Sequence, residues 1–377
     1  MFKDYTGQEY ISNVKEQHNI MIFIGNGFDI SVLAKYRNDK LISSYSKFYD
    51  YLCYKGFNEN NCLFDKMGKD KIAEKENWSD FECSLGELIR SNVSIKLLDD
   101  ALKEIQDMFL LFLNEIVTPE ILLALSNDAA MYGWGKKALS GFLEDLCEKD
   151  YEKMSFPKKT GHYHMYNYLF VNFNYTSLFD NYVYLDRHQF EPHPYKTVDT
   201  NFKFYPNPNG YKKKGIVDST KMNDKTVWSS FIMMDTIHPH GYQNIPKSLL
   251  LGIEDETYVS DRELNKFNKS YWAQNNQKYK SYFEGAELFI VYGTSIGETD
   301  SWWWRNICRA LLTRDSELII YYYNSGDYER AYIKQMFISA SRNTFTEEEI
   351  MKIKEKIYVV LYNDKSDLKM FGLKNND

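Results

Sequence analysis

Short apolar runs recur along the chain, and each is followed by glycine or asparagine. They cover residues 19–24, 166–173, 288–292, 318–323 and 357–362. Continuous apolar runs of this length are typical of strands that are buried on both faces of a parallel sheet. Helical patterns at residues 302–312 and from residue 328 onward separate the last three runs. This alternation predicts an α/β fold, with a mainly parallel, Rossmann-like sheet covered by helices on both faces.

The stretch between the first two apolar runs has a helical pattern instead. Residues 40–52, 78–91 and 119–149 have helical character, and residues 95–117 carry apolar side chains at helical spacing. We therefore predict a Rossmann-like nucleotide-binding domain made of residues 1–40 and 160–377. A large helical insertion at residues 41–159 interrupts it.

Local signals refine the remaining segments. Ser79 and Glu82 have the spacing of a capping box, which predicts a helix that starts at Ser79. The charged segment 66–77 is predicted to be an exposed loop or the edge of a helix. Residues 182–253 favour several strands and loops broken by prolines, and residues 261–283 favour a charged helix.

The charge balance excludes one class of function. The 377 residues include 46 Lys and Arg against 53 Asp and Glu, a formal net charge of −7. This balance argues against a whole-chain electrostatic grip on DNA or RNA, so we expect no nucleic-acid partner. We interpret the short basic cluster at 212–214 as solvated surface.

Cysteine usage and the chain start bear on metal binding and localisation. The five cysteines include no CxxC pair, so we expect reduced thiols and no metal site. The polar start of the chain does not resemble a signal peptide, and the longest apolar runs are too short for a membrane span. We therefore expect a cytoplasmic protein without membrane contact.

The first candidate site is the glycine turn after the first predicted strand, Gly25-Asn26-Gly27-Phe28-Asp29. Gly25 and Gly27 would let the backbone approach a phosphate, and the following helix N-terminus would offer free N–H groups. The third glycine of the dinucleotide fingerprint is missing, because Ile30 occupies its position. The alternative is a tight turn whose glycines supply a positive φ.

The second candidate site is Asn172-Phe173-Asn174-Tyr175-Thr176, directly after a buried strand. Side chains at the carboxyl ends of strands face the ligand crevice of an open α/β sheet. Asn174 is therefore placed to bind a ribose hydroxyl or to position a water. The alternative is that Asn174 or Thr176 caps the next helix.

The third candidate is the segment His238-Pro239-His240-Gly241. Histidine is the usual general base near neutral pH. Two histidines at positions i and i+2 of an extended chain point in opposite directions, so we expect only one of them to face the site. The pair His162 and His164 has the same spacing, and we interpret it as structural.

The fourth candidate follows the strand at 288–292. Gly293, Thr294 and Ser295 form a small-residue loop that could contact ribose or phosphate, and Asp300 stands before a predicted helix. The alternative role for Asp300 is that of a helix N-cap. Three tryptophans follow at 302–304, and a triple Trp is more typical of a core or an interface than of a base-stacking platform.

Taken in order, these segments resemble the AbiH family of bacteriophage abortive infection proteins. The resemblance rests on IGNGFD, SYSKF (44–48), WSDFE (78–82), NFNYT, HPHG and YGTSIGETD, and it covers residues 22–300. It departs from the family at residues 30–34, where ISVLA replaces a small His-Gly-Leu-type segment. The resemblance implies an antiviral defence role with an unknown phage trigger.

The same arrangement is distantly similar to sirtuin-like NAD-binding domains. That similarity implies NAD, or a related nucleotide, as the substrate or ligand, with Gly25 and Gly27 seating the pyrophosphate. Asn174 would hold the ribose and His240 would take a proton from water or a ribose hydroxyl. Asp29 or Asp300 would place a carboxylate near the sugar. Thr176 replaces the usual acid and zinc-binding Cys pairs are missing, so a deacetylase is a poor fit.

Tyr175 and the residues of the two glycine loops would complete the cofactor-binding set, and a candidate NAD glycohydrolase is the enzyme that this set favours. Two alternatives remain open: a nucleotide-sensing module without catalysis and, less favoured, a toxin that acts on RNA or DNA. The oligomeric state, including a homo-oligomer, is also left open by the sequence.

Overall fold

Six parallel strands form the centre of the protein. The computed structural model describes residues 1–6, 14–157, 164–185, 230–254, 261, 263–324 and 328–374. The strands lie in the order β3-β2-β1-β4-β5-β6, and every neighbouring pair is parallel. Their bounds are β1 Glu16–Ile24, β2 His164–Asn172, β3 Ser230–Ile237, β4 Leu288–Tyr292, β5 Glu317–Tyr323 and β6 Ile357–Tyr362. The predicted Rossmann-like parallel sheet is confirmed.

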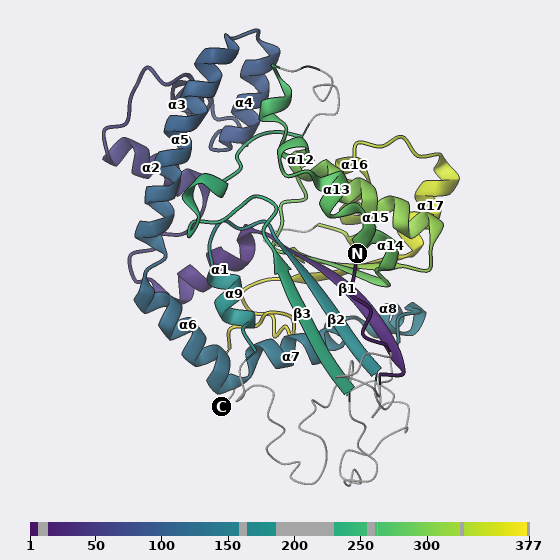
Figure 1. Cartoon of the computed structure of the whole chain (residues 1–377). Coiled ribbons are helices and arrows are strands. Elements are labelled where there is room, and N and C mark those ends of the chain that lie inside the picture. Colours follow the sequence, from purple (N-terminus) through teal and green to yellow (C-terminus); the bar gives the residue numbers. More distant parts are fainter. Residues whose placement is uncertain are drawn as a thin grey trace.

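The strand order creates a switch point between β1 and β4. From β1 the chain moves outward through β2 to β3, then returns to the other side of β1 and continues through β4, β5 and β6 (Figure 1). The connections that leave β1 and β4 therefore diverge. In sheets of this kind the resulting crevice at the carboxyl ends of the strands is the usual ligand site.

Both faces of the sheet are covered, which explains the unbroken apolar runs. On β1, Ile20 and Ile22 enter one core cluster, whereas Met21 and Phe23 enter the other. The second cluster lies against α14 Lys280–Gly285, α15 Ser301–Thr313, α16 Arg330–Ala340 and α17 Glu347–Glu355. Trp303 and Trp304 pack edge-on against Phe23, so the tryptophan run belongs to this core.

The opposite face is covered by helices between β1 and β2 and by α9. These are α1 Asn26–Tyr36, α2 Tyr45–Tyr54, α3 Cys62–Ile72, α4 Phe81–Arg90, α5 Ile95–Ile116, α6 Pro119–Tyr132, α7 Trp134–Gly141, η2 Phe142–Asp145, α8 Glu148–Lys153 and α9 Leu178–Val183. In Figure 1, α2 to α5 extend beyond the carboxyl ends of the strands, while α6 lies to the side, next to α1 and α9, and leads into α7. The insertion therefore reaches the crevice.

The apolar stripe predicted for residues 95–117 is fully buried. It comprises Leu98, Leu102, Ile105, Phe109, Phe112 and Ile116. Among the described residues, no single helix has both the length and the apolar composition for a membrane crossing, and α5 with α6 reaches them only as a pair bent by 56°.

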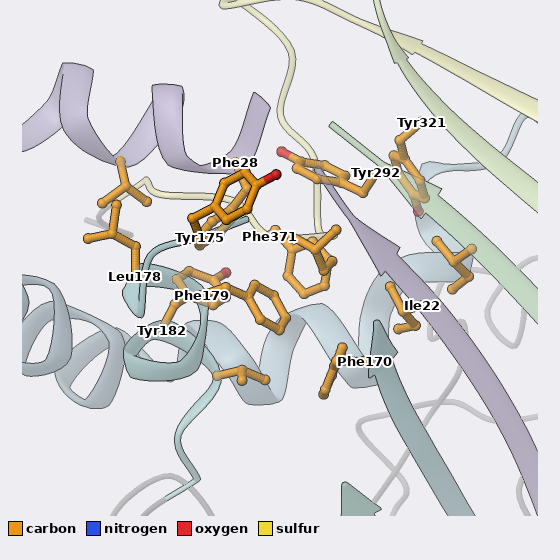
Figure 2. Close-up of a cluster of buried hydrophobic side chains, with 14 of the residues drawn as sticks. Ile22, Phe28, Phe170, Tyr175, Leu178, Phe179, Tyr182, Tyr292, Tyr321 and Phe371 are labelled. Atoms are coloured by element: carbon orange, nitrogen blue, oxygen red, sulfur yellow. The ribbon is translucent and has the colours of Figure 1, made fainter. Parts of the chain in front are cut away.

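An aromatic cluster joins the C-terminal segment to the crevice side of the sheet (Figure 2). The Phe371 ring meets Phe28, Phe179 and Tyr292 edge-on, with centroid distances of 6.0, 5.2 and 5.1 Å. Edge-to-face packing of this kind adds stabilisation beyond the buried area itself. The chain after β6 thus returns to seal the core beneath the first glycine turn.

One local prediction, the capping residue of α4, is wrong. Asp80, not Ser79, caps α4, because its side chain accepts from the N–H groups of Glu82 and Cys83 at 3.0 and 3.1 Å. Residues 62–72 form helix α3, since Asn61 caps it and Lys–Asp pairs support its charged face.

The segment 261–283 is largely helical, as predicted, but it is divided into short helices. They are η6 Asn265–Phe267, α12 Lys269–Trp272, α13 Asn275–Lys278 and α14. Gln274 adopts a left-handed conformation with φ 55°, which ends the helical run between α12 and α13. Of the strands expected at 182–253, β3 is present, and residues 186–229 with the 212–214 cluster lie outside the described part of the chain.

Candidate functional site

A cavity of about 730 Å³ opens at the carboxyl ends of the strands. Its lining brings together the loops after β1, β2, β3 and β4, with side chains from the helical insertion on the facing side. The predicted site residues that line it are Gly25, Asn26, Gly27, Asp29, Asn174, Tyr175, His240, Gly293, Thr294, Ser295 and Asp300. Four segments that are far apart in sequence therefore share one cavity.

Phe28 is the one predicted site residue that does not line the cavity. Its side chain is 1% exposed and packs edge-on against Phe179 and Tyr182. Because α1 turns its apolar face toward the core, the residue between Gly27 and Asp29 points away from the crevice.

The glycine turn after β1 packs against the glycine loop after β4. A Cβ on Gly25 would lie 2.6 Å from the Gly293 carbonyl oxygen, and a Cβ on Gly27 would lie 2.8 Å from the Gly293 Cα. Gly25 has an extended φ of −110°, so the alternative explanation by a positive φ does not apply to it. The close approach that these glycines allow is between two loops of the protein itself.

Backbone hydrogen bonds lock this loop pair. The Gly25 N–H donates to the Tyr292 carbonyl at 2.9 Å and the Gly27 N–H donates to the Gly293 carbonyl at 2.8 Å. The Phe28 N–H donates to the Gly25 carbonyl at 3.1 Å. The amides of residues 27 and 28, which a phosphate at the start of α1 would normally use, are therefore already engaged.

Asn26 ties the same turn to the insertion. Its Nδ2 donates to the Ser43 carbonyl at 2.9 Å, and the Ser43 hydroxyl donates to Asn26 Oδ1 at 2.5 Å. Both residues line the cavity. The start of the insertion is thus fixed to one wall of the site.

Asp29 is buried, and each of its carboxyl oxygens accepts a hydrogen bond. Asn174 Nδ2 donates to one carboxyl oxygen at 2.9 Å, and the Thr176 hydroxyl donates to the other at 2.6 Å. Burial raises the pKa of Asp29 to about 7, although these two hydrogen bonds oppose the shift. Thr176 thus acts as a hydrogen-bond donor to an acid on α1.

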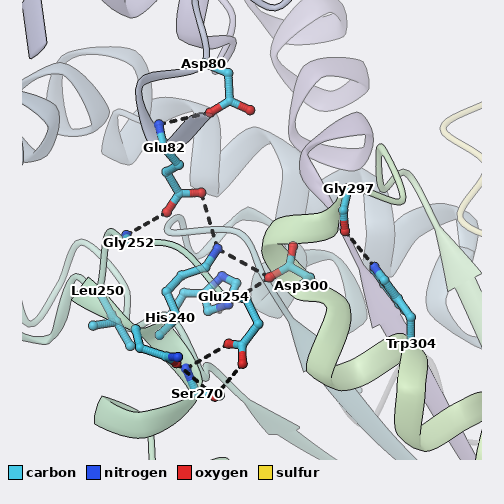
Figure 3. Close-up of polar contacts among 12 residues, drawn as sticks. Asp80, Glu82, His240, Leu250, Gly252, Glu254, Ser270, Gly297, Asp300 and Trp304 are labelled. Atoms are coloured by element: carbon cyan, nitrogen blue, oxygen red, sulfur yellow. Dashed lines mark hydrogen bonds and ion pairs between the residues drawn. The ribbon is translucent and has the colours of Figure 1, made fainter. Parts of the chain in front are cut away.

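His240, Asp300, Lys269 and Glu82 form a chain of charged groups along the cavity (Figure 3). Asp300 Oδ1 lies 3.3 Å from His240 Nε2 and 3.3 Å from Lys269 Nζ. Lys269 Nζ also donates to Glu82 Oε2 at 3.2 Å, and Glu82 Oε1 accepts from the Gly252 N–H at 2.9 Å. One lysine therefore joins a carboxylate of the insertion to one in the segment between β4 and α15.

The environment sets different protonation preferences along this chain. Burial raises the pKa of Asp300, but Lys269 and His240 outweigh burial and hold it below the usual range. Burial and the positive charge of Lys269 lower the pKa of His240. The cavity therefore holds an ionised carboxylate, Asp300, beside an imidazole, His240, whose neutral form is favoured at physiological pH. A neutral imidazole can accept a proton, and the neighbouring anion favours that step.

The two neighbouring acids stay closer to neutral. Burial raises the pKa of Glu82 to about 7 despite the opposing charge of Lys269. Burial likewise raises the pKa of Glu254 to about 7, while Ser270 donates to both of its oxygens at 2.6 and 3.1 Å. Burial also lowers the pKa of Lys269, but Asp300 and Glu82 outweigh it and raise the pKa above the usual range.

The two histidines of the HPHG segment have separate partners, as predicted. His240 lines the cavity and stacks on Phe173 at a centroid distance of 5.0 Å. His238 does not line it; its Nε2 lies 3.0 Å from Asp180 Oδ1 and its ring stacks on Tyr242. Asp300 occupies the N-cap position of α15 but makes no capping hydrogen bond, so its carboxylate remains with the cavity.

Several lining residues were not predicted from the sequence. Lys269 and Glu82 were missed because each lies in a segment that looks like charged helix surface. The position of Glu82 at the end of the WSDFE motif could have identified it, but we interpreted Glu82 as part of a capping box. An aromatic wall at the ends of β5 and β6 was also missed, and it consists of Tyr321, Tyr322, Tyr323 and Tyr362.

Comparison with known proteins gives one match. A family model described as "Bacteriophage abortive infection AbiH" matches residues 21–322, which include every residue that lines the cavity except Tyr323, Tyr362 and Asp364. Neither the curated proteins nor the solved structures contain a match.

Proposed function

Because the chain belongs to the AbiH family of bacteriophage abortive infection proteins, we propose that its cavity hydrolyses the N-glycosidic bond of a nucleotide, with NAD as the first candidate. In this reaction water replaces nicotinamide at the ribose C1′, the C–N bond breaks, and a proton is released. Loss of NAD in an infected cell would stop metabolism before phage are produced.

The acidic lining of the cavity supports this reaction. Five carboxylic acids line it, whereas Lys269 is the one Lys or Arg side chain among its lining residues. Breaking a nicotinamide–ribose bond builds positive charge on the sugar in the transition state. A buried, preorganised carboxylate stabilises such charge more strongly than water does. NAD also carries its positive charge on the nicotinamide that leaves.

The size of the cavity and the donors on its walls are compatible with a nucleotide. Its volume of about 730 Å³ lies within the range of roughly 300–1,000 Å³ that is usual for small-molecule sites. Thr294 has a buried hydroxyl without a hydrogen-bond partner in the described part of the chain, and it lines the cavity. Because the amides of residues 27 and 28 are engaged, phosphate contacts would fall to Asn26, Thr294 and Ser295.

The geometry favours Asp300 over Asp29 as the carboxylate near the sugar. Asp300 is held ionised beside His240, whereas Asp29 has both oxygens bonded by neighbours and a raised pKa. His240 would take the proton from water or a ribose hydroxyl, and Asp300 would stabilise the imidazolium that forms. Asn174, fixed by Asp29, would orient the ribose or the water.

The test is nicotinamide release from NAD by the purified full chain. We expect wild type to release nicotinamide and His240→Gln to lose at least a hundredfold in rate, in line with the removal of a general base. His238→Gln is the matched control, because this histidine also pairs with a carboxylate but lies outside the cavity.

Equal inactivity of wild type and His240→Gln, with cellular NAD unchanged through phage infection, would contradict the proposal. Equal activity of the two proteins would show that the chemistry does not use His240.

A non-catalytic nucleotide sensor is the second candidate, favoured by the degree to which the site groups already satisfy one another. The Gly27 amide is bonded to Gly293 and both Asp29 oxygens are bonded by Asn174 and Thr176. A NAD-induced rise in melting temperature without nicotinamide release would favour sensing.

A further inference from the structure

A second group of polar side chains lies at the opposite end of the sheet from the cavity. Glu16 and His18 are at the start of β1, and His164 is at the start of β2. The parallel register places Glu16 beside His164. Side chains two residues apart on a strand share a face, so all three point to the same side of the sheet.

Their ligand atoms converge. His18 Nε2 lies 3.3 Å from His164 Nδ1. The Glu16 carboxylate lies 3.4 Å from His164 Nε2 through one oxygen and 3.8 Å from His18 Nε2 through the other. One ligand atom from each of the three residues lies within 4.8 Å of the other two. Nothing in the proposed chemistry of the cavity uses this group.

Glu287, just before β4, sets the orientation of the buried imidazole. Its Oε2 lies 2.9 Å from His18 Nδ1, on the ring edge opposite His164. Because a carboxylate accepts, this contact places the proton of neutral His18 on Nδ1 and leaves the Nε2 lone pair aimed at His164. A carboxylate behind a histidine is the usual arrangement around a metal-bound imidazole.

We propose that Glu16, His18 and His164 bind a divalent transition-metal ion of the zinc type. Imidazole nitrogens bind zinc at about 2.0–2.1 Å, so two of them in a tetrahedral site are roughly 3.3–3.4 Å apart. The two imidazoles of this cluster already have that spacing. Three protein ligands leave a fourth position for water.

The donor count within the cluster also favours a cation. With the His18 Nδ1 proton directed to Glu287, neutral His164 has one proton for two acceptors, His18 Nε2 and Glu16. One of its nitrogens then faces a lone pair or an anion without a hydrogen between them. A second proton on His164 or a metal ion between the three groups removes this conflict, and the test below distinguishes the two.

The prediction of no metal site depended on the absence of a CxxC pair and on a structural role for His164. A site made of imidazoles and a carboxylate needs no cysteine, and its ligands here come from strands 146 residues apart. The ion would join the first strand to the strand that follows the helical insertion. It would therefore link the strands that precede and follow the insertion, at the amino ends of the sheet.

The test uses the full chain without an affinity tag, after EDTA treatment and dialysis. We expect calorimetry with ZnCl₂ to give one ion per chain and the melting temperature to rise. Co²⁺ should give the intense visible absorption of a tetrahedral site, and Mg²⁺ should give neither response. His164→Gln should weaken Zn²⁺ binding at least tenfold, and Glu287→Gln by roughly 10–100-fold, as expected for the group behind a ligand.

His238→Gln is the control, because it removes a histidine–carboxylate pair elsewhere and should leave Zn²⁺ binding unchanged. Glu16→Gln changes an exposed side chain, so it tests the site even where His164→Gln fails to fold. Absence of Zn²⁺ heat and Co²⁺ absorption in wild type would overturn the proposal. Binding that Glu16→Gln, His164→Gln and Glu287→Gln leave unchanged would also overturn it.

Discussion

The two ends of the sheet hold the same kinds of side chain in different surroundings. At the carboxyl ends, Lys269 and Glu82 are 4% and 6% exposed, and Asp300 completes their chain. At the amino ends, His18 is buried but its carboxylate partners Glu16 and Glu287 are 57% and 42% exposed. The first network is largely buried, with Asp300 19% exposed, whereas the carboxylates of the second are about half exposed to solvent.

The difference in exposure sets different requirements on the charges of the two clusters. A largely buried network must neutralise itself, because an unpaired buried charge is strongly unfavourable. It can then hold His240 and Asp300 in unequal protonation states inside a cavity. A partly exposed cluster has no such requirement, and it can take its compensating cation from solution. The comparison predicts unequal responses to matched substitutions at the two ends.

The largest difference should come from removing one charge at each end. Lys269→Met keeps most of the side-chain volume but leaves Glu82 and Asp300 without their shared cation, so we expect a loss of about 3–5 kcal/mol in unfolding free energy. Glu287→Gln alters one hydrogen bond to His18 at a half-exposed site, and we expect about 1 kcal/mol. Urea unfolding measures the loss in unfolding free energy of both variants. Equal losses would contradict the proposed difference between the two ends of the sheet.

The next effect concerns the two glycine loops that form the cavity wall. Gly293 has φ +66° and a Cβ there would lie 2.9 Å from the Phe28 backbone nitrogen, so Gly293→Ala should cost about 2–4 kcal/mol. Gly56 has φ +63° with nothing within 4 Å of its Cβ position, so Gly56→Ala should cost about 1 kcal/mol. Denaturant unfolding of the two variants measures these losses in unfolding free energy. A difference near zero would mean that loop contact does not require glycine.

A smaller effect should appear as a pH slope. The pKa of Asp29 is raised from 3.8 to about 7, so between these values the folded state binds more protons than the unfolded state. Stability should therefore fall as pH rises from 4 to 7 and level off above that. Asp29→Asn should remove up to about 1.4 kcal/mol per pH unit of this slope.

Unfolding curves at half-unit pH steps compare Asp29→Asn with wild type. An unchanged slope in Asp29→Asn would show that another group carries the titration.

The sequence predicted the scaffold better than the chemistry. Residues 288–292 and 357–362 were predicted to the residue, because a parallel strand buried on both faces leaves an unbroken apolar run. The rule that ligands meet at the carboxyl ends of strands also placed Gly25, Asn174, His240 and Gly293 on one cavity.

The rest of the site depends on contacts that no local pattern records. Lys269 and Glu82 are 187 residues apart, and each belongs to a segment whose charges look solvated. Phe28 was misassigned because the turn motif carries no information about which face α1 buries. His164 was interpreted as structural for a similar reason, since its partners His18 and Glu16 lie on β1, far away in the sequence.

We propose that the nucleotide binds in the cavity between the Gly25 loop and His240. The most direct measurement is a crystal structure of the full chain soaked with NAD, using His240→Gln to slow turnover. We predict density for the ligand in this cavity, with its ribose near Asn174 and Asp300. A nucleotide bound elsewhere, or only water in the cavity at saturating NAD, would contradict the account.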